Sequence, residues 1–188
     1  MTNKTLASLP NELMLIDQAK NDPAAFSAIY NFYFARVYNY ARYRILDRDL
    51  ADDLTSEIFE AVLKNLHTFR SEKGSFSAWL FTIARNTVNY SLRKRRIRQW
   101  WSLDHTHEHA DHNPKPDETT ILNETQRELL QAISQLSERE RELVALKFSV
   151  GLTNRAISKM TGLKENNVAT ILFRAKQRIR AQMNSNGE

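Results

Sequence analysis

Hydrophobic residues recur every three or four positions along most of the chain, a spacing that places them on one face of an α-helix. The clearest stripe lies in the front half of the stretch 76–101 and comprises Phe76, Trp79, Leu80, Ile83, Ala84, Thr87 and Ser91. Similar stripes predict helices at 11–20, from 23 through 41, and at 50–66, 122–136, 137–150, 153–160 and 164–183. No segment alternates as a strand would, so the sequence predicts an all-α protein.

For three of these helices the sequence also predicts which residues face inward or outward. In the first, Leu13, Ile16 and either Ala19 or Met14 should face inward. In the second, the inward face should comprise Phe26, Ile29, Tyr30, Tyr33, Val37 and Ala41. Aromatic rings at this spacing usually pack in a core, and stacking on bases is the alternative. The outward face of helix 50–66 carries Asp52, Asp53, Glu57 and Glu60, and is available to a partner.

Short polar signals mark where several of these helices begin and end. Asp22 followed by Pro23 is an N-cap followed by proline at the first helical position. Ser137 and Glu140 form the S-x-x-E pattern of a capping box, which starts a new helix. Thr153 is a plausible N-cap, and Gly151 ends the helix before it.

The end of the stretch 76–101 is strongly basic. Its cations from 85 to 98 are Arg85, Arg93, Lys94, Arg95, Arg96 and Arg98, and no acid lies among them. Such a surface suits the phosphates of a nucleic acid, as does the net charge of +5. The alternatives are a solvated helix end and an anionic membrane surface. The cations lie beyond the apolar stripe and not opposite it, which disfavours the membrane.

A second pattern typical of DNA binding lies near the C-terminus. A short helix at 153–160, a turn at 161–163 that contains Gly162, and a long basic helix at 164–183 match a helix-turn-helix. We expect Asn166, Asn167 and Thr170 to reach base edges, since asparagine pairs well with adenine. We interpret Arg174, Lys176 and Arg178 as phosphate ligands or solvated charges.

The helical pattern disappears between about 102 and 120, which is rich in acidic residues and proline and reads as a flexible acidic linker. It contains His105, His107, His109 and His112, and 107–112 matches the H-x-H-x-D-H pattern of metal-dependent hydrolases. That motif requires a strand end and further ligands downstream, so we expect no catalytic metal here. The chain has no cysteine and no long apolar run, so we expect a cytoplasmic protein without membrane insertion.

Taken together, two helical units facing DNA resemble the extracytoplasmic-function (ECF) sigma factors, a two-domain branch of the sigma-70 family. In the first unit the matching strings are 22–26, 30–33, 37–38, 51–54, 57–59, 79–80, 83–86 and 93–94. In the second they are Leu136, 141–142, 151–153, Ile157, 162–163, Val168 and 174–176. The resemblance implies sigma region 2 over 11–101, a linker over 102–120 and sigma region 4 over 121–184.

The resemblance also implies partners and site residues. Core RNA polymerase would bind Asp52, Asp53 and Glu57. The promoter -10 element would be opened and held by Phe69, Arg70, Lys73, Arg85, Asn86, Arg93, Lys94 and Arg96. The -35 element would be read as duplex by Thr153, Lys164, Asn166, Asn167, Thr170, Arg174, Lys176 and Arg178. No catalysis and no cofactor of its own are implied, and whether an anti-sigma factor binds the chain is left open.

Some positions depart from the family pattern. Tyr90 stands where an aspartate is usual, and Ala169 and Ile171 replace two typical DNA ligands. Lys164 is a poor N-cap in place of serine, at a cost of about 1 kcal/mol. The -35 sequence should therefore differ from the common one, or be bound more weakly. Trp100 and Trp101 either pack on the domain or contact polymerase or DNA. A stand-alone helix-turn-helix regulator is the alternative function.

Overall fold

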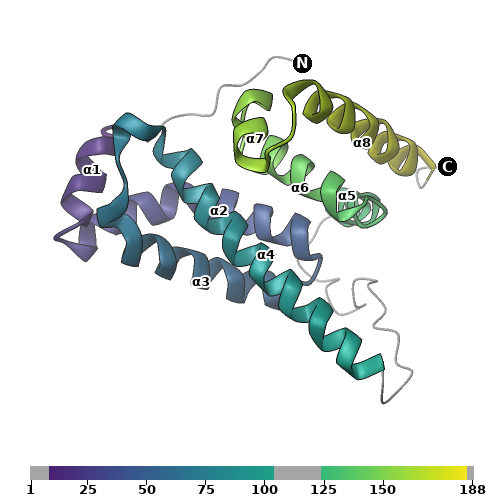
Figure 1. Ribbon diagram of the computed structural model, residues 1–188, viewed down its shortest axis with the longest axis horizontal. Coiled ribbons are helices and arrows are strands. Elements are labelled where there is room, and N and C mark those ends of the chain that lie inside the picture. Colours follow the sequence, from purple (N-terminus) through teal and green to yellow (C-terminus); the bar gives the residue numbers. More distant parts are fainter. Residues whose placement is uncertain (1–8, 104–123, 186–188) are drawn as a thin grey trace.

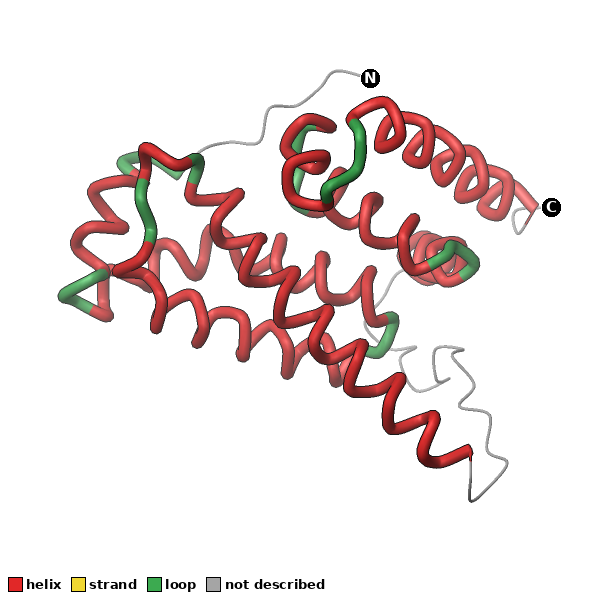
Figure 2. The backbone as a smooth tube through the Cα atoms, viewed as in Figure 1, coloured by secondary structure: helices red, strands yellow, loops and turns green. Residues whose placement is uncertain are grey.

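The computed structural model describes residues 9–103 and 124–185, and every regular element within these ranges is helical (Figures 1 and 2). The N-terminal domain contains α1 (Glu12–Ala19), α2 (Pro23–Ile45), α3 (Arg48–Asn65), η1 (Leu66–Thr68), η2 (Ser71–Lys73) and α4 (Phe76–Leu103). The C-terminal domain contains α5 (Glu124–Ser134), α6 (Glu138–Val144), the π-helical segment η4 (Ala145–Ser149), α7 (Asn154–Thr161) and α8 (Glu165–Ser185). The prediction of an all-α protein with two small helical domains is confirmed.

Two aspartates set the beginnings of α2 and α3. The side chain of Asp22 accepts a hydrogen bond from the Ala24 amide at 2.9 Å, and Pro23 occupies the first turn as predicted. The chain then reverses at Leu46, whose φ of 64° is unusual for a residue with a side chain. Asp47 caps α3 by accepting from the Leu50 amide at 3.1 Å, so α3 begins earlier than its apolar stripe predicted.

Helix α4 is the longest helix in the described chain and crosses the N-terminal domain diagonally (Figure 1). The hydroxyl of Ser75 caps it by accepting from the Ala78 amide at 3.2 Å. Its first half is buried against α2 and α3 through Phe76, Leu80, Phe81, Ala84 and Val88. Its second half projects beyond the bundle, so the change from apolar to basic sequence coincides with the change from buried to exposed helix.

The expectations about the first two helices were wrong at two positions. Leu13 is exposed, because the side of α1 that packs on α2 is the one that carries Ile16 and Ala19. Tyr30 lies at the rim of the core, where its ring contacts Phe59 at 4.5 Å between centroids. The other predicted positions of the second helix, Phe26, Ile29, Tyr33, Val37 and Ala41, are buried.

The C-terminal domain shows the predicted helix starts. Ser137 and Glu140 make both hydrogen bonds of a capping box, and the Thr153 hydroxyl accepts from the Ala156 amide at 3.1 Å. Gly162 ends α7 at φ 75°, in a left-handed conformation that a side chain would strain. Helix α8 follows with Val168, Leu172 and Ala175 buried, which completes a helix-turn-helix.

The two domains contact each other directly, with α2 packed on α6 and η4. Arg44 of α2 is buried and donates to the backbone carbonyl of Glu138 at 3.0 Å. Apart from its first two residues, which continue α4, the predicted linker at 102–120 lies outside the described residues, and so does its histidine cluster. In the described part of the chain, no helix is long and apolar enough to cross a membrane, and no cluster of acids and histidines could hold a metal ion.

Candidate nucleic-acid interface

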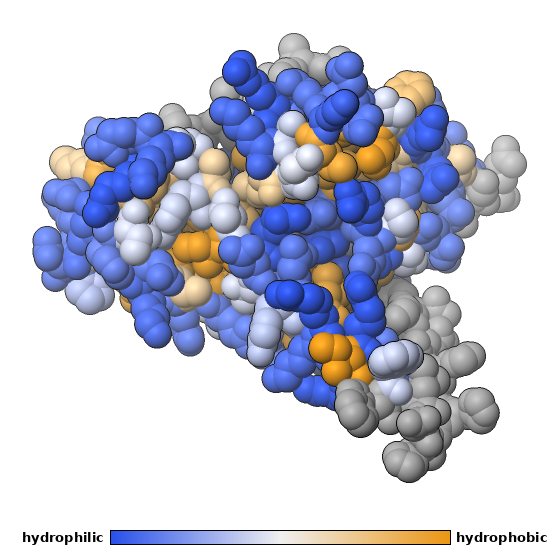
Figure 3. Space-filling model, in the orientation of Figure 1, coloured by the Kyte–Doolittle hydropathy of each residue, from blue (hydrophilic) through white to orange (hydrophobic). Residues whose placement is uncertain are grey.

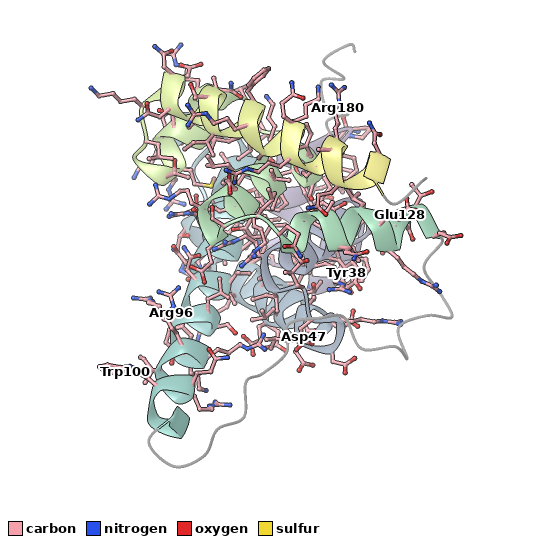
Figure 4. All side chains as sticks on the ribbon, turned by 90° about the vertical axis from the view of Figure 1, so that its right-hand side faces the viewer. Tyr38, Asp47, Arg96, Trp100, Glu128 and Arg180 are labelled. Atoms are coloured by element: carbon pink, nitrogen blue, oxygen red, sulfur yellow. The ribbon has the colours of Figure 1, made fainter. Side chains whose placement is uncertain are left out.

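The basic half of α4 forms the first surface of interest. Arg93, Lys94, Arg96 and Arg98 are exposed there, while Arg85 and Arg95 are partly covered. In Figure 4 the labelled Arg96 and Trp100 lie on the part of α4 that extends away from the other helices. The projecting helix end therefore offers a row of guanidinium groups to a polyanion.

Acids from other elements neutralise part of this row. Arg85 Nε donates to Glu142 Oε1 at 2.7 Å, and Arg96 Nη2 donates to Glu138 Oε2 at 2.7 Å. Arg95 lies 3.8 Å from Asp47. The stretch contains no acid, as the sequence shows, but the fold supplies acids distant in the chain. No described acid lies within ion-pair distance of Arg93, Lys94 or Arg98.

A pocket of about 440 Å³ opens between the basic face of α4 and the C-terminal domain. It is lined by Arg44, Asn86, Asn89, Leu92, Arg93, Arg96 and Glu138. Three guanidinium groups thus face one carboxylate, and two amides add hydrogen-bond donors. The lining favours an anion such as a phosphate group.

The remaining residues predicted for the -10 element lie at the other end of α4. The ring of Phe69 is buried against Phe76 and Trp79, with centroids 5.3 and 5.7 Å away. Arg70 donates to the carbonyls of His67 and Phe69 at 2.7 and 3.0 Å, and Lys73 is exposed on η2. The structure therefore does not bring this group together with the basic half of α4, and its role remains a prediction.

Sequence reasoning missed an apolar stripe on the exposed half of α4. Tyr90 and Ile97 are exposed, and Trp100 is 80% exposed, so the packing interpretation of Trp100 is wrong. Figure 3 shows a hydrophobic patch among hydrophilic side chains over this end of the helix. The positions 90, 93, 97 and 100 share one helical face, so Arg93 lies between Tyr90 and the apolar side chains of Ile97 and Trp100 along it. Such a face can stack on bases while it binds phosphates.

The second surface is the outer side of α8. Asn166, Asn167, Thr170 and Arg174 are exposed there, and the Thr170 hydroxyl donates to the Asn166 carbonyl at 2.9 Å. Phe173, which sequence reasoning did not select, is exposed on the same side. The sequence could have indicated the exposure of Phe173, because this residue lies outside the helical stripe of Val168, Leu172 and Ala175. An exposed phenylalanine can contact a thymine methyl group.

The other residues predicted for the -35 element differ in their surroundings. Thr153 uses its hydroxyl to cap α7, Lys164 is exposed in the turn, and Lys176 is partly buried. Arg178 donates to Glu140 Oε1 at 2.8 Å and to Oε2 at 3.1 Å, so it links α8 to α6. The guanidinium of Arg178 is thus engaged within the domain.

Asp52, Asp53 and Glu57 form the third surface. All three are exposed along the outer side of α3, and no described cation lies within ion-pair distance of them. The inward side of the same helix is buried through Ala51, Leu54 and Ile58. The three carboxylates are therefore positioned on a rigid helix and free to meet a basic partner.

Comparison with known proteins agrees with this architecture. The sequence profile of Sigma-70 region 2 matches residues 29–98, and that of Sigma-70, region 4 matches residues 126–179. The ECF RNA polymerase sigma factor BldN of Streptomyces coelicolor is 31% identical over 162 residues, which cover 86% of this chain and 61% of BldN. SigX of Bacillus subtilis, also an ECF sigma factor, is 28% identical over 84% of this chain and 83% of its own length.

Two solved structures share the fold. The sigma factor RpoE of Bartonella quintana, in complex with the anti-sigma factor NepR, has a TM-score of 0.69 at 20% identity, over 85% of this chain and 96% of that one. CnrH, in complex with the cytosolic domain of CnrY, has a TM-score of 0.63 at 19% identity, over 92% and 96%. Both domains therefore match in order, in sequence and in fold, and the chain belongs to the sigma-70 family, in its ECF branch.

Proposed function

We propose that the protein binds core RNA polymerase and directs it to promoters, where it helps to open the duplex. The observation that supports this proposal is the presence on one chain of two separate surfaces whose chemistry suits nucleic acid. The exposed cations of α4 that have no described acidic partner lie on one domain, and the exposed polar face of α8 lies on the other. A factor that holds two promoter elements at once needs this arrangement. The polymerase supplies the chemistry of RNA synthesis.

The -35 element would be bound as duplex by the helix-turn-helix. Helix α8 would enter the major groove, where Asn166, Asn167 and Thr170 reach base edges and Arg174 contacts phosphate. Phe173 would add a contact with a thymine methyl group. Because Ala169 and Ile171 lack polar side chains, this part of the helix would read shape and methyl groups more than hydrogen-bonding edges.

The -10 element would be held as a separated strand along α4. Arg93, Lys94 and Arg98 would bind its phosphates, and Tyr90 and Trp100 would stack on its bases. Extruding a base costs a few kcal/mol, which these contacts must offset. Phe69 and Arg70 would contribute only if the segment before α4 opens, since the ring of Phe69 is buried.

Core polymerase would dock on the acidic side of α3. Exposed carboxylates on a rigid helix attract a basic partner and speed its encounter. We expect Asp53→Asn to weaken binding of the chain to immobilised core enzyme. Glu124→Gln, which removes the same charge from exposed α5, is the matched control and should bind as the wild type does.

The decisive experiment is run-off transcription with purified core enzyme on genomic fragments. Specific start sites that depend on the added chain are the expected result, and they would reveal the promoter sequence. Transcription without specific start sites would contradict the proposal.

A stand-alone DNA-binding regulator is the second candidate, because the helix-turn-helix is complete within the C-terminal domain. A regulator would bind duplex DNA at specific sequences without polymerase. Gel-shift assays with and without core enzyme separate the two functions. Specific binding by the chain alone, together with no effect on start-site selection, would favour the regulator.

A further inference from the structure

We propose that Glu138 and Glu142 of α6 act as an internal competitor of DNA, by occupying on α4 the cations that phosphates would bind. The two ion pairs, Arg85–Glu142 and Arg96–Glu138, are called the latch below. The inference rests on the proposed function, since it assumes that α4 binds DNA. It adds that the protein must separate its two domains before α4 is fully available.

The inner pair of the latch is held in a buried polar cluster. Glu142 is 8% exposed, and its Oε1 accepts from Arg85 Nε at 2.7 Å. Tyr40 and Arg44 of α2 are both buried beside this pair. Tyr40 interacts electrostatically with Arg44, Arg85 and Glu142, and burial raises its pKa to about 12. The Nε group of Arg85 is thus paired by the C-terminal domain while its side chain is 25% exposed, so a phosphate would have to displace Glu142 to bind the whole guanidinium.

The outer pair is accessible and therefore exchangeable. Arg96 Nη2 contacts both carboxylate oxygens of Glu138, at 3.0 and 2.7 Å, while the side chains remain 64% and 49% exposed. Exposed pairs of this kind contribute little and are screened by salt. The backbone carbonyl of Glu138 accepts from Arg44, which keeps the residue over α4.

The pocket beside the outer pair offers an entry for the competing phosphate. Arg93 lines it without any described acidic partner, and Asn86 and Asn89 supply amides. Asn89 already accepts from Arg44 at 2.7 Å, so its amide group is held in place. A phosphate bound at Arg93 would then lie next to Arg96 and could replace Glu138 there. Loss of the outer pair would leave the inner pair as the remaining ionic contact of the latch.

Competition of this kind lowers the apparent affinity of the chain for DNA. If only the open form binds through α4, the observed dissociation constant rises by the reciprocal of the open fraction. Weakening the latch should therefore tighten binding without adding any contact to DNA. It should also steepen the salt dependence, because salt opens the latch of the wild type while it screens the phosphates.

The test measures binding of a short fluorescein-labelled single-stranded DNA of mixed sequence to the full chain without polymerase. Glu138→Gln should bind about two- to five-fold more tightly than the matched control Glu124→Gln, with a steeper salt dependence. Glu142→Gln should show a larger gain, since its pair is buried. Equal affinities for Glu138→Gln and Glu124→Gln would overturn the inference.

A second measurement follows the domains directly. The chain has no cysteine, so spin labels at Lys64→Cys on α3 and Lys159→Cys on α7 report one distance between the domains. Added DNA and the Glu138→Gln exchange should each shift the distance distribution to longer values. Unchanged distances in the DNA-bound protein would overturn the inference. A chain that opens in this way but selects no start sites with core enzyme would contradict the proposed function and not the latch.

Discussion

The guanidinium of Arg178 on α8 lies 2.8 Å from Glu140 Oε1, and the same carboxylate accepts from the Ser137 amide at 3.0 Å. The carboxylate of Glu140 therefore caps the N-terminus of α6 and also links α8 to α6. Although Arg178 lies on the basic helix that would read DNA, its charge is engaged within the domain. This separates it from Arg174, which is exposed and has no described acidic partner.

Replacement of Arg178 should affect stability, and replacement of Arg174 should affect DNA binding. Arg178→Gln should lower the free energy of unfolding by about 0.5–1 kcal/mol, because an ion pair to a largely covered carboxylate is lost. Arg174→Gln should leave unfolding unchanged and weaken duplex binding by the holoenzyme across sequences, reducing the salt slope by about one. Urea unfolding and salt titrations of binding measure the two effects. A stability loss confined to Arg174→Gln would contradict this assignment.

The pH dependence of stability should contain a contribution from Glu140. Burial alone would raise the pKa of Glu140, but hydrogen bonds from Ser137 and the charge of Arg178 lower it below its ordinary value. A depressed pKa stabilises the fold at pH values above the unfolded pKa of about 4.3, and that stabilisation is lost as pH falls through the folded pKa. Wild type should therefore exceed Glu140→Gln in stability at neutral pH, and the difference should shrink below about pH 4. Unfolding curves over a pH series test this, and a constant difference would refute it.

Trp100 should matter for function and not for folding. Because its side chain is 80% exposed, Trp100→Ala should change the free energy of unfolding by less than about 0.5 kcal/mol. Phe81→Ala, on the buried half of α4, should cost about 3–5 kcal/mol. If Trp100 stacks on the separated strand, its replacement should reduce promoter opening, as followed by permanganate reactivity of unpaired thymines. Opening at the wild-type level would exclude that role.

Asn166 should contribute sequence discrimination at one base step. Removing a bidentate contact costs about 1–3 kcal/mol against the correct base and nothing against others. Asn166→Ala should thus equalise holoenzyme binding to promoters that differ only at the contacted -35 position. Lys164→Ala, at the exposed turn, is the comparison and should weaken all promoters alike. Undiminished discrimination by Asn166→Ala would place base reading elsewhere on α8.

The features predicted correctly from the sequence depend on short-range geometry. The capping box of Ser137 and Glu140 spans four residues and needs no information about the rest of the fold. The buried face of α4 likewise follows from the helical repeat, since Phe76, Leu80 and Ala84 must share one side. Interactions of this kind are encoded by spacing alone.

The features that were missed depend on packing between elements distant in the chain. The partners of Arg85 and Arg96 lie 57 and 42 residues away, and no local pattern connects them. Leu13 repeats with helical spacing but has no neighbouring element to bury it. Phe69 lies in a loop, yet its ring is buried against Phe76 and Trp79, which its loop position did not indicate; its contact with DNA stays a prediction. In each case periodicity limits the choices and tertiary contacts decide among them.

The π-helical segment Ala145–Ser149 makes the packing of the protein sensitive to the exact number of residues at this point of the chain. A π turn holds about one residue more than an α turn, and each residue of an α-helix turns the chain by about 100°. Deleting one residue there would restore α-helical spacing and turn Leu146 or Val150, both buried, away from the core. A single codon at this point therefore decides which side chains of the segment reach the core, and its loss would disturb the contact between the two domains, since η4 packs on α2.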